Sequence, residues 1–178
     1  MAADLTEQWT AQLAAVRAHM AAPGVASLDD LRALSGAQFL DAMGRGTLPA
    51  PHIGDTLEFW PVEWEVGRMV FQGTPHIGHY NPIGTVHGGW IAAILDSAVG
   101  CAVHTALPPG TGYTTVELKL NYVRAVTDET GPMRAEGRVI HVGRQLATAE
   151  GRLQDARGKL YAHASTTCLV FSLPARRG

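Results

Sequence analysis

The chain has 178 residues, which fits one ordinary domain with a sizeable core and at most a small appendage. It is 46% hydrophobic and 17% charged with a formal net charge of −2, and its glycines and prolines are spread along the chain, so a disordered or collagen-like protein is excluded. The first residues lack the positive charge and the short apolar core of a signal peptide, and we therefore expect a cytoplasmic protein.

Charge is unevenly distributed along the chain. Residues 1–112 carry 4 basic and 10 acidic side chains, whereas residues 113–178 carry 10 basic and 6 acidic ones. Eight of these ten basic residues are Arg, which binds phosphate well, but they are interspersed with acids. The second half could therefore hold an anionic ligand, whereas nucleic-acid binding gains little support. The only stretch apolar enough for a membrane, residues 88–107, contains Asp96, so we expect no membrane segment.

Two amphipathic helices are predicted at the N-terminus. Apolar residues recur at three- and four-residue steps over residues 5–21, the spacing of one helix face. A second helix is expected to begin at Ser27, as its N-cap, and to end near Gly44. Residues 47–55 contain two prolines and a glycine and are typical of a linker into the main domain.

Two strands are predicted after this linker. Residues 56–66 and 68–73 contain several aromatic and β-branched residues and are separated by Gly67. Because Pro61 cannot donate a hydrogen bond to a neighbouring strand, the first of these strands is expected at a sheet edge or at a bulge.

The central stretch, residues 81–107, is a polar Gly-rich turn followed by a helix that is apolar on every side. Such a helix belongs inside a core. Asp96 lies in its middle, and no Lys or Arg of the same helix can pair with it. Because a buried carboxylate must be paired, hydrogen-bonded or neutralised, Asp96 is either a structural acid bonded to a distant group or a functional one.

Four more strands are predicted after the central helix, over residues 113–123, 133–142, 145–154 and 159–171. Alternation in the first of them places Thr115 on the face opposite to Val116 and Leu118. Because the connections are short, the strands are expected to be antiparallel neighbours, and their Ala and Gly residues allow a curved sheet to approach the helix closely. The predicted fold class is therefore α+β.

The chain resembles the PaaI-like acyl-CoA thioesterases of the hotdog-fold thioesterase superfamily over about residues 55–172. The resemblance lies in NPIGTVHGGWIAAILDSA, TTVELKLNYVRAV and EGRVIHVGRQLATAEGRLQDARGKLYAHAS. It implies a hotdog fold, a curved antiparallel sheet around one long central helix, in residues 51–178, with residues 1–50 as an N-terminal helical extension. It also implies hydrolysis of an acyl-CoA thioester by a homodimer or homotetramer, with coenzyme A as part of the substrate and no cofactor.

The resemblance assigns roles to single residues. In the resembling enzymes the acid at the position of Asp96 is the nucleophile or the general base, and the backbone amide at Gly88 polarises the thioester carbonyl. Asn81 and His87 match residues that line the site. Thr115 matches a hydroxyl residue that orients water in some relatives, where a serine is more frequent. The residues alone also allow His87 and Asn81 only to stabilise the turn.

Helix geometry adds a requirement to these roles. At about 1.5 Å per residue, Asp96 lies roughly 12 Å along the helix from Gly88, which is beyond the reach of one carboxylate. If both groups act on one carbonyl, they must come from two copies of the chain related by a two-fold axis. We therefore expect an obligate homodimer with two composite sites.

The arginines of the second half are candidates for binding the anionic end of coenzyme A. Arg144, in the turn next to Gly143, is the first candidate, and Arg138 and Arg124 follow. The acyl group of the substrate stays open, because the depth of the pocket depends on packing.

No metal site is predicted. His76, His79 and His87 lie close in sequence, but no acid or Cys joins them at ligand spacing. Cys101 and Cys168 are expected to be small core residues and not disulfide partners.

Two alternatives to a thioesterase remain. The first is a hotdog protein that binds acyl-CoA without cleaving it, because fold does not fix function. The second is an acyl-thioester hydratase or dehydratase. Its motif would place an Asp directly before residues 81–83 and a His directly after them, where this chain has Tyr80 and Gly84.

Overall fold

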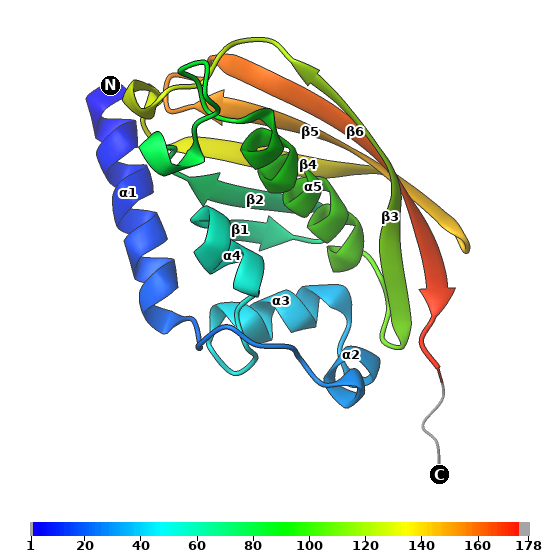
Figure 1. Ribbon diagram of the computed structural model, residues 1–178. Helices are drawn as coiled ribbons and strands as arrows, with labels where there is room; N and C mark the ends of the chain where they lie inside the picture. Colours follow the sequence, from blue (N-terminus) through cyan, green and yellow to red (C-terminus); the bar gives the residue numbers. More distant parts are fainter. Residues whose placement is uncertain (1, 175–178) are drawn as a thin grey trace.

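The computed structural model describes residues 2–174, with side chains described from residue 5 onward. A curved sheet of six antiparallel strands, in the order β1-β2-β4-β5-β6-β3, wraps around one long helix, α5 (Figure 1). The strands are β1 (Phe59–Glu65), β2 (Arg68–Gly73), β3 (Thr111–Tyr122), β4 (Met133–Val142), β5 (Leu146–Asp155) and β6 (Leu160–Ser172). The α+β hotdog architecture and all six predicted strands are therefore confirmed, and the bounds of β2 and β4 agree residue for residue.

The sheet has β1 and β3 as its two edges. The register of β1 shifts between Pro61 and Glu63, which confirms the predicted edge or bulge. The prediction that strands with short connections are neighbours is wrong for β3 and β4, because β3 pairs with β6 and β4 pairs with β2 and β5. Their connection forms no hairpin, since Val126 is buried in the core and its carbonyl accepts a hydrogen bond from the Val86 amide at 2.9 Å.

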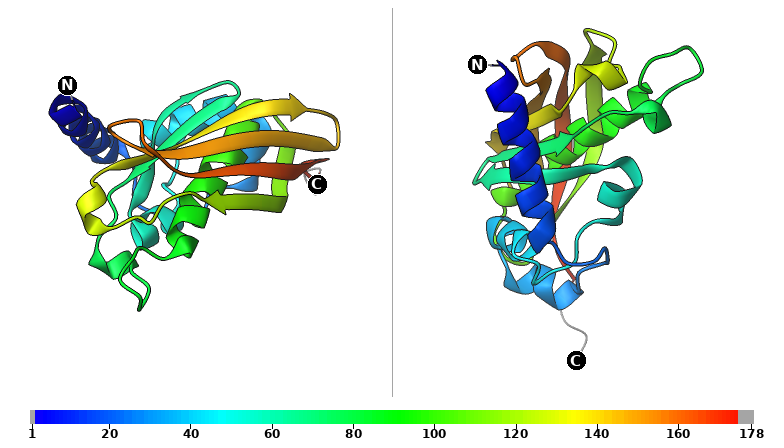
Figure 2. Two further views of the ribbon diagram at one scale, coloured as in Figure 1. Left: turned by 90° about the horizontal axis from the view of Figure 1, so that it is seen from above. Right: turned by 90° about the vertical axis from the view of Figure 1, so that its left-hand side faces the viewer.

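Helix α5 (Gly88–Thr105) lies inside the curve of the sheet (Figure 2). Glycine in the strands permits this approach, because a Cβ at Gly137 would lie only 2.3 Å from the Ala98 carbonyl oxygen of the helix. No helix of residues 2–174 has the length and apolar character needed to cross a membrane.

The expectation that α5 is buried on every side is only partly right. Ten of its residues are buried, but one strip along the helix stays half-buried. The strip, called the open strip below, consists of Ala92, Ala93, Asp96, Ser97, Cys101 and His104. Because these six side chains stay partly accessible, a single copy of the chain leaves this side of the central helix incompletely covered.

Four helices precede the sheet: α1 (Ala2–His19), α2 (Leu28–Ala33), α3 (Gly36–Gly44) and α4 (His52–Leu57). The prediction of one helix from Ser27 to Gly44 has the correct ends but misses a break. Ser35 and Gln38 form a second capping box, so a new helix begins where the first was expected to continue. Helix α4 occupies part of the predicted linker and starts after Pro51.

Helix α1 packs beside the edge strand β1 (Figure 2, right). The Arg17 guanidinium lies 3.8 Å from the centre of the Trp60 ring, and the Arg134 guanidinium lies 4.3 Å from that of Trp9. Arg134 also donates a hydrogen bond to Gln12 Oε1 at 2.7 Å. The N-terminal helix therefore contacts β1 and the interior strand β4, whereas β3 at the other edge has only β6 as a partner within the chain.

Candidate active site

The N-terminus of α5 is shaped by the turn that precedes it. His87 is the N-cap residue, and its Nδ1 accepts a hydrogen bond from the Gly89 amide at 2.8 Å. His87 therefore has the turn-stabilising role that the residues alone allowed. The Gly88 amide has no hydrogen-bond partner among the described residues, so this first N–H of the helix is an available donor.

Tyr122, at the end of β3, contacts the carbonyl side of the same residue, Gly88. Its hydroxyl donates a hydrogen bond to the Gly88 carbonyl oxygen at 3.0 Å. Its ring also packs against Gly88, because a Cβ added there would lie 3.1 Å from the Tyr122 ring. Tyr122 was not among the predicted site residues. Only the pairing of β3 with the start of α5 brings it there, and sequence spacing does not reveal that pairing.

A cavity of about 480 Å³ lies at this end of α5. Its lining includes His87, Gly88 and Tyr122 together with Asn81 and Arg124. One cavity thus brings together four residues predicted for the site: Asn81, His87, Gly88 and Arg124. The helix N-terminus contributes a favourable dipole for a negative charge within it.

Asn81 holds the turn that forms one wall of this cavity. Its Oδ1 accepts a hydrogen bond from the Ile83 amide at 3.0 Å, and its Nδ2 donates to Thr85 Oγ1 at 3.1 Å. Both ends of the side chain are therefore engaged within the turn, as in an Asx turn. The geometry supports a positioning role for Asn81 in this chain.

Asp96 is held from β3. Thr115 Oγ1 donates a hydrogen bond to Asp96 Oδ1 at 3.1 Å, and Asp96 is half-buried on the open strip. A β-bulge makes this contact possible: the register with β6 shifts between Thr115 and Glu117, and Val116 is 56% exposed. The predicted uninterrupted alternation of β3 is therefore wrong, since Thr115 and Leu118 both turn inward on the two sides of the bulge.

The two candidate catalytic groups do not share a site within one chain. Asp96 does not line the cavity at the start of α5, and it lies eight positions after Gly88 in the helix, about 12 Å along the axis. The expected separation therefore holds in the folded chain. Each group lacks its partner unless a second copy supplies one.

The surroundings of Asp96 carry no other charge on the open strip. Burial raises the pKa of the Cys101 thiol to about 11, and it raises the pKa of the neighbouring Tyr113 hydroxyl well above its usual value. Burial also lowers the pKa of His104 below its usual value, which favours the neutral imidazole. Asp96 is the only acid of α5, and these three neighbouring side chains stay neutral near pH 7.

The predicted coenzyme A ligands lie in different places. Arg124 lines the cavity and donates a hydrogen bond to the Leu160 carbonyl at 2.5 Å. Arg138 pairs with Glu136 at 2.5 Å on β4, outside this cavity. The β4–β5 turn, with Gly143 and Arg144, lies at the end of the sheet away from the start of α5 (Figure 1). Within one chain, only Arg124 is brought to the cavity.

The three histidines that precede α5 in sequence lie in two different places. His87 caps α5, whereas His76 and His79 lie beside Glu58. The expectation that no acid joins these histidines considered only neighbours in sequence, and Glu58 comes from another element. This group lies outside the cavity at the start of α5.

Comparisons with known proteins agree with this architecture. Residues 83–162 match the family model of the thioesterase superfamily. A proposed esterase from Saccharolobus solfataricus is 35% identical over 116 residues, which cover 65% of this chain and 80% of that protein. A proposed esterase from Halobacterium salinarum is 36% identical over 69 residues, 38% of this chain. The match spans only 44% of that protein's length.

Solved structures extend the comparison. A proposed thioesterase from Ralstonia eutropha JMP134, related to phenylacetic acid degradation, is 28% identical with a TM-score of 0.67. The match covers 74% of this chain and 98% of that one. The protein smu.793 of Streptococcus mutans UA159, solved with acetyl CoA bound, is 22% identical with a TM-score of 0.59. Here the match covers 66% of this chain and 91% of the other and shows the likeness of fold.

Proposed function

Because this chain belongs to the thioesterase superfamily, we propose that it hydrolyses an acyl-coenzyme A thioester to the free acid and coenzyme A. One observation carries the proposal. The helix that presents an unpartnered amide at Gly88 to a cavity also holds Asp96, a half-buried carboxylate bonded to Thr115.

The chemistry of thioester hydrolysis matches these two groups. The reaction needs a donor for the oxygen that gains negative charge and a base or nucleophile for the attack. The Gly88 amide, aided by the helix dipole, would bind that oxygen. Asp96 would take the proton of an attacking water or attack the carbonyl carbon itself. By either route the carbon–sulfur bond breaks and coenzyme A leaves as the thiol.

Thr115 supports Asp96 in both routes. Its hydroxyl donates a hydrogen bond to Asp96 Oδ1, and Asp96 Oδ2 has no hydrogen-bond partner among the described residues. The free oxygen is then the one that meets water or the thioester. Thr115 is therefore assigned a positioning role through its hydrogen bond.

The active unit is proposed to be a homodimer in which each site takes Gly88 from one copy and Asp96 from the other. Two features favour this arrangement. The open strip leaves the Asp96 side of α5 partly uncovered, and β3 is an edge strand whose outer hydrogen-bonding groups a second β3 could pair. A two-fold axis between two such helices would bring each Gly88 amide toward the other copy's Asp96.

The acyl carrier is proposed to be coenzyme A. The Streptococcus mutans protein of the same fold was solved with acetyl CoA, and Arg124 places a guanidinium beside the cavity of this chain. A guanidinium suits the phosphates of such a ligand. Arg138, Arg144 and Gly143 could reach the nucleotide end only in the assembled dimer or tetramer.

A thiol-release assay over a panel of acyl-CoAs tests the proposal. Asp96→Asn keeps the shape of the side chain but removes the base, and release should fall at least about a hundredfold. Ser97→Ala, at the next position of the open strip, is the matched control and should keep activity within about threefold. Wild-type release by Asp96→Asn would refute the role of Asp96. No release from any acyl-CoA by the wild type would refute the proposed activity and favour a binding protein or a hydratase.

The two routes can also be separated. Direct attack by Asp96 gives a mixed anhydride with the acyl group as the thiol leaves, and hydrolysis of that anhydride at the Asp96 carbonyl in ¹⁸O-water puts label into the carboxylate. Base catalysis labels only the product acid, so label in Asp96 after a single turnover identifies direct attack. Mass spectrometry of the peptide that contains Asp96 distinguishes the two results.

A further inference from the structure

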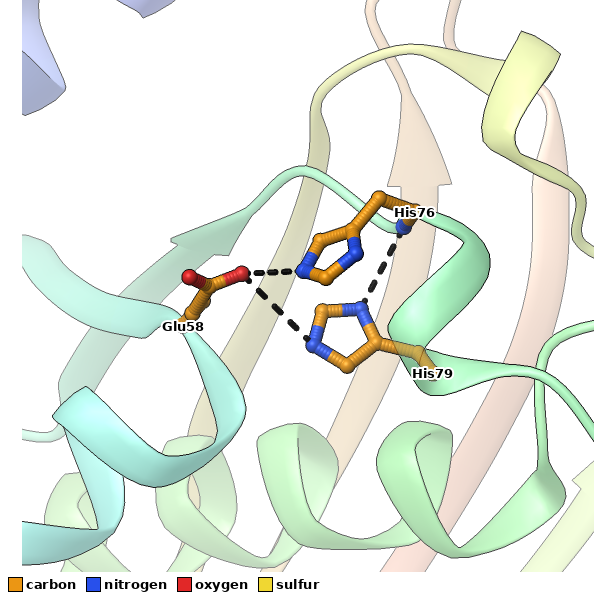
Figure 3. A group of neighbouring side chains, drawn as sticks. All are labelled: Glu58, His76 and His79. Atoms are coloured by element: carbon orange, nitrogen blue, oxygen red, sulfur yellow. Dashed lines mark hydrogen bonds and ion pairs between the residues drawn. The ribbon is translucent and has the colours of Figure 1, made fainter.

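Three potential metal ligands converge outside the candidate active site (Figure 3). Glu58 caps helix α4 in the left-handed backbone conformation, with φ at 54°, and precedes β1. His76 is the N-cap of the short 3₁₀ helix η1 (Ile77–His79), and His79 is the last residue of that helix. The Glu58 carboxylate and one ring nitrogen of each histidine lie within 4.8 Å of one another.

We infer that Glu58, His76 and His79 form a binding site for a divalent transition-metal cation, with Zn²⁺ as the cation that best fits the donors. Two imidazole nitrogens and one carboxylate oxygen are a donor set that zinc takes at three positions, with the fourth left for water. Imidazole ligands also favour zinc over calcium and magnesium, which prefer oxygen donors. The site is distinct from the proposed thioesterase chemistry.

The spacing of the donors is close to what zinc requires. Bonds of about 2.0–2.1 Å in a tetrahedron place neighbouring ligand atoms roughly 3.3 Å apart. Glu58 Oε2 lies 3.9 Å from His79 Nε2, and it also contacts His76 Nε2 directly. A small rotation of the Glu58 side chain away from His76 and toward His79 would make the two separations similar.

Burial supports a site with one fixed ligand and two that can adjust. The His79 side chain is 6% exposed and packs near the Trp90 ring, with ring centres 5.4 Å apart. The side chains of His76 and Glu58 are 48% and 49% exposed. These two also line a cavity of about 310 Å³ beside α1, so a cation can reach the ligands from solvent.

The present hydrogen bonds define what must change on binding. His76 Nδ1 accepts from the Gly78 amide at 3.0 Å, and His79 Nδ1 accepts from the His76 amide at 3.3 Å. Neutral rings therefore carry their protons on Nε2, facing Glu58. A cation at both Nε2 atoms displaces these protons, and each ring takes up one at Nδ1. The two amides can then no longer donate to Nδ1 and must hydrogen-bond to water. Water can reach them because both bonds are solvent-exposed.

Zinc titration of the full chain, freed of any affinity tag and treated with a chelator, tests the inference. Isothermal calorimetry should show one Zn²⁺ per chain. His76→Ala and Glu58→Gln, both at accessible side chains, should each weaken binding about tenfold or more. His141→Ala removes an exposed histidine of β4 instead and should leave the affinity unchanged.

A spectroscopic readout makes the test independent of the calorimetry. Cobalt bound in place of zinc at a four-coordinate site gives strong visible absorption, which should appear at one equivalent in the wild type and in His141→Ala and be lost in His76→Ala. The inference is overturned if the wild type binds no Zn²⁺ saturably. It is also overturned if His76→Ala and Glu58→Gln bind Zn²⁺ as tightly as the wild type does, since other groups would then hold the ion.

Discussion

Replacing Gly137 by Ala tests how closely the sheet holds the helix that carries the candidate catalytic groups. Gly137 lies in β4, opposite Gly151 of β5, and faces the backbone of α5. A Cβ at this position would lie 2.3 Å from the Ala98 carbonyl oxygen and 2.8 Å from the Val99 amide nitrogen. These are backbone atoms, so no side-chain rotation relieves the collision.

The expected magnitude follows from these distances. An ordinary contact is near 3.4 Å, so the helix or the strand must move by about 1 Å. Overpacking of this kind costs about 3 kcal/mol or more at the upper end of the usual range. For a chain of this size, that lowers the melting temperature by roughly 6–12 °C. Because Asp96 lies two residues from Ala98, a shift of this size should also reduce kcat by about a hundredfold.

Chemical denaturation followed by circular dichroism gives the free energy of unfolding, and thiol release gives kcat. Gly110→Ala is the matched control: Gly110 has φ at 76° but no atom within 4 Å of an added Cβ. It should cost only the backbone conformation, about 1 kcal/mol, and leave kcat unchanged. Wild-type stability in Gly137→Ala would refute the close packing of helix on sheet.

Three further predictions concern single groups. Because burial raises the pKa of Cys101 to about 11 from a usual value of 9.0, its thiolate fraction at pH 8 should be about a hundredfold lower in the folded chain than in the unfolded one. Iodoacetamide labelling read by mass spectrometry should be slowed accordingly, and equal rates in the two states would contradict this. Tyr122→Phe removes the hydrogen bond to Gly88 but keeps the ring, so kcat should fall five- to tenfold with stability nearly unchanged; an unchanged kcat would exclude the positioning role. Partial burial raises the pKa of Glu63, but hydrogen bonds and ion pairs with Arg68 and Arg134 lower it overall below its usual value of 4.5. The stability that Glu63 contributes is therefore complete above pH 4.5 and is lost as the pH falls below that value. A Glu63→Gln variant should be less stable than the wild type at pH 7. In denaturant titrations between pH 6 and 3, its free energy of unfolding should depend less on pH than that of the wild type.

The sequence predicts the elements better than their pairing. Strand-forming residues and Gly turns define β2 and β4 to the residue, and the apolar stretch after His87 defines α5, because these signals are local. Ser35 was missed as a helix start because the apolar period continues through it, and its capping box competes successfully with that period. Local patterns do not report such competition.

The part of the candidate site that is local in sequence was predicted, and the part that depends on distant elements was not. The turn and helix that hold Gly88 and Asp96 form one continuous segment, so their chemistry is visible in sequence. The bulge at Val116, which turns Thr115 toward Asp96, has no local signal in an otherwise alternating strand. Tyr122 and Glu58 reach their places through the path of the chain between distant elements, and only the folded structure brings them there.

Mixed dimers test the central claim, that each active site combines Gly88 of one copy with Asp96 of the other. Gly88→Pro removes the amide donor at the first helical position, where proline is tolerated, and the extended backbone of His87 is compatible with a following proline. The added ring meets Tyr122, which is 55% exposed and can yield. Asp96→Asn removes the carboxylate, so each variant alone should be inactive.

Coexpression of the two variants gives mixed dimers in which one site carries both defects and the other carries neither. With random pairing, thiol release should return to about a quarter of the wild-type rate per chain. Separately purified variants that cannot exchange subunits should stay inactive when mixed. Recovery near a quarter supports the composite site, whereas no recovery in coexpressed, folded dimers would contradict it and place both groups in one chain's site.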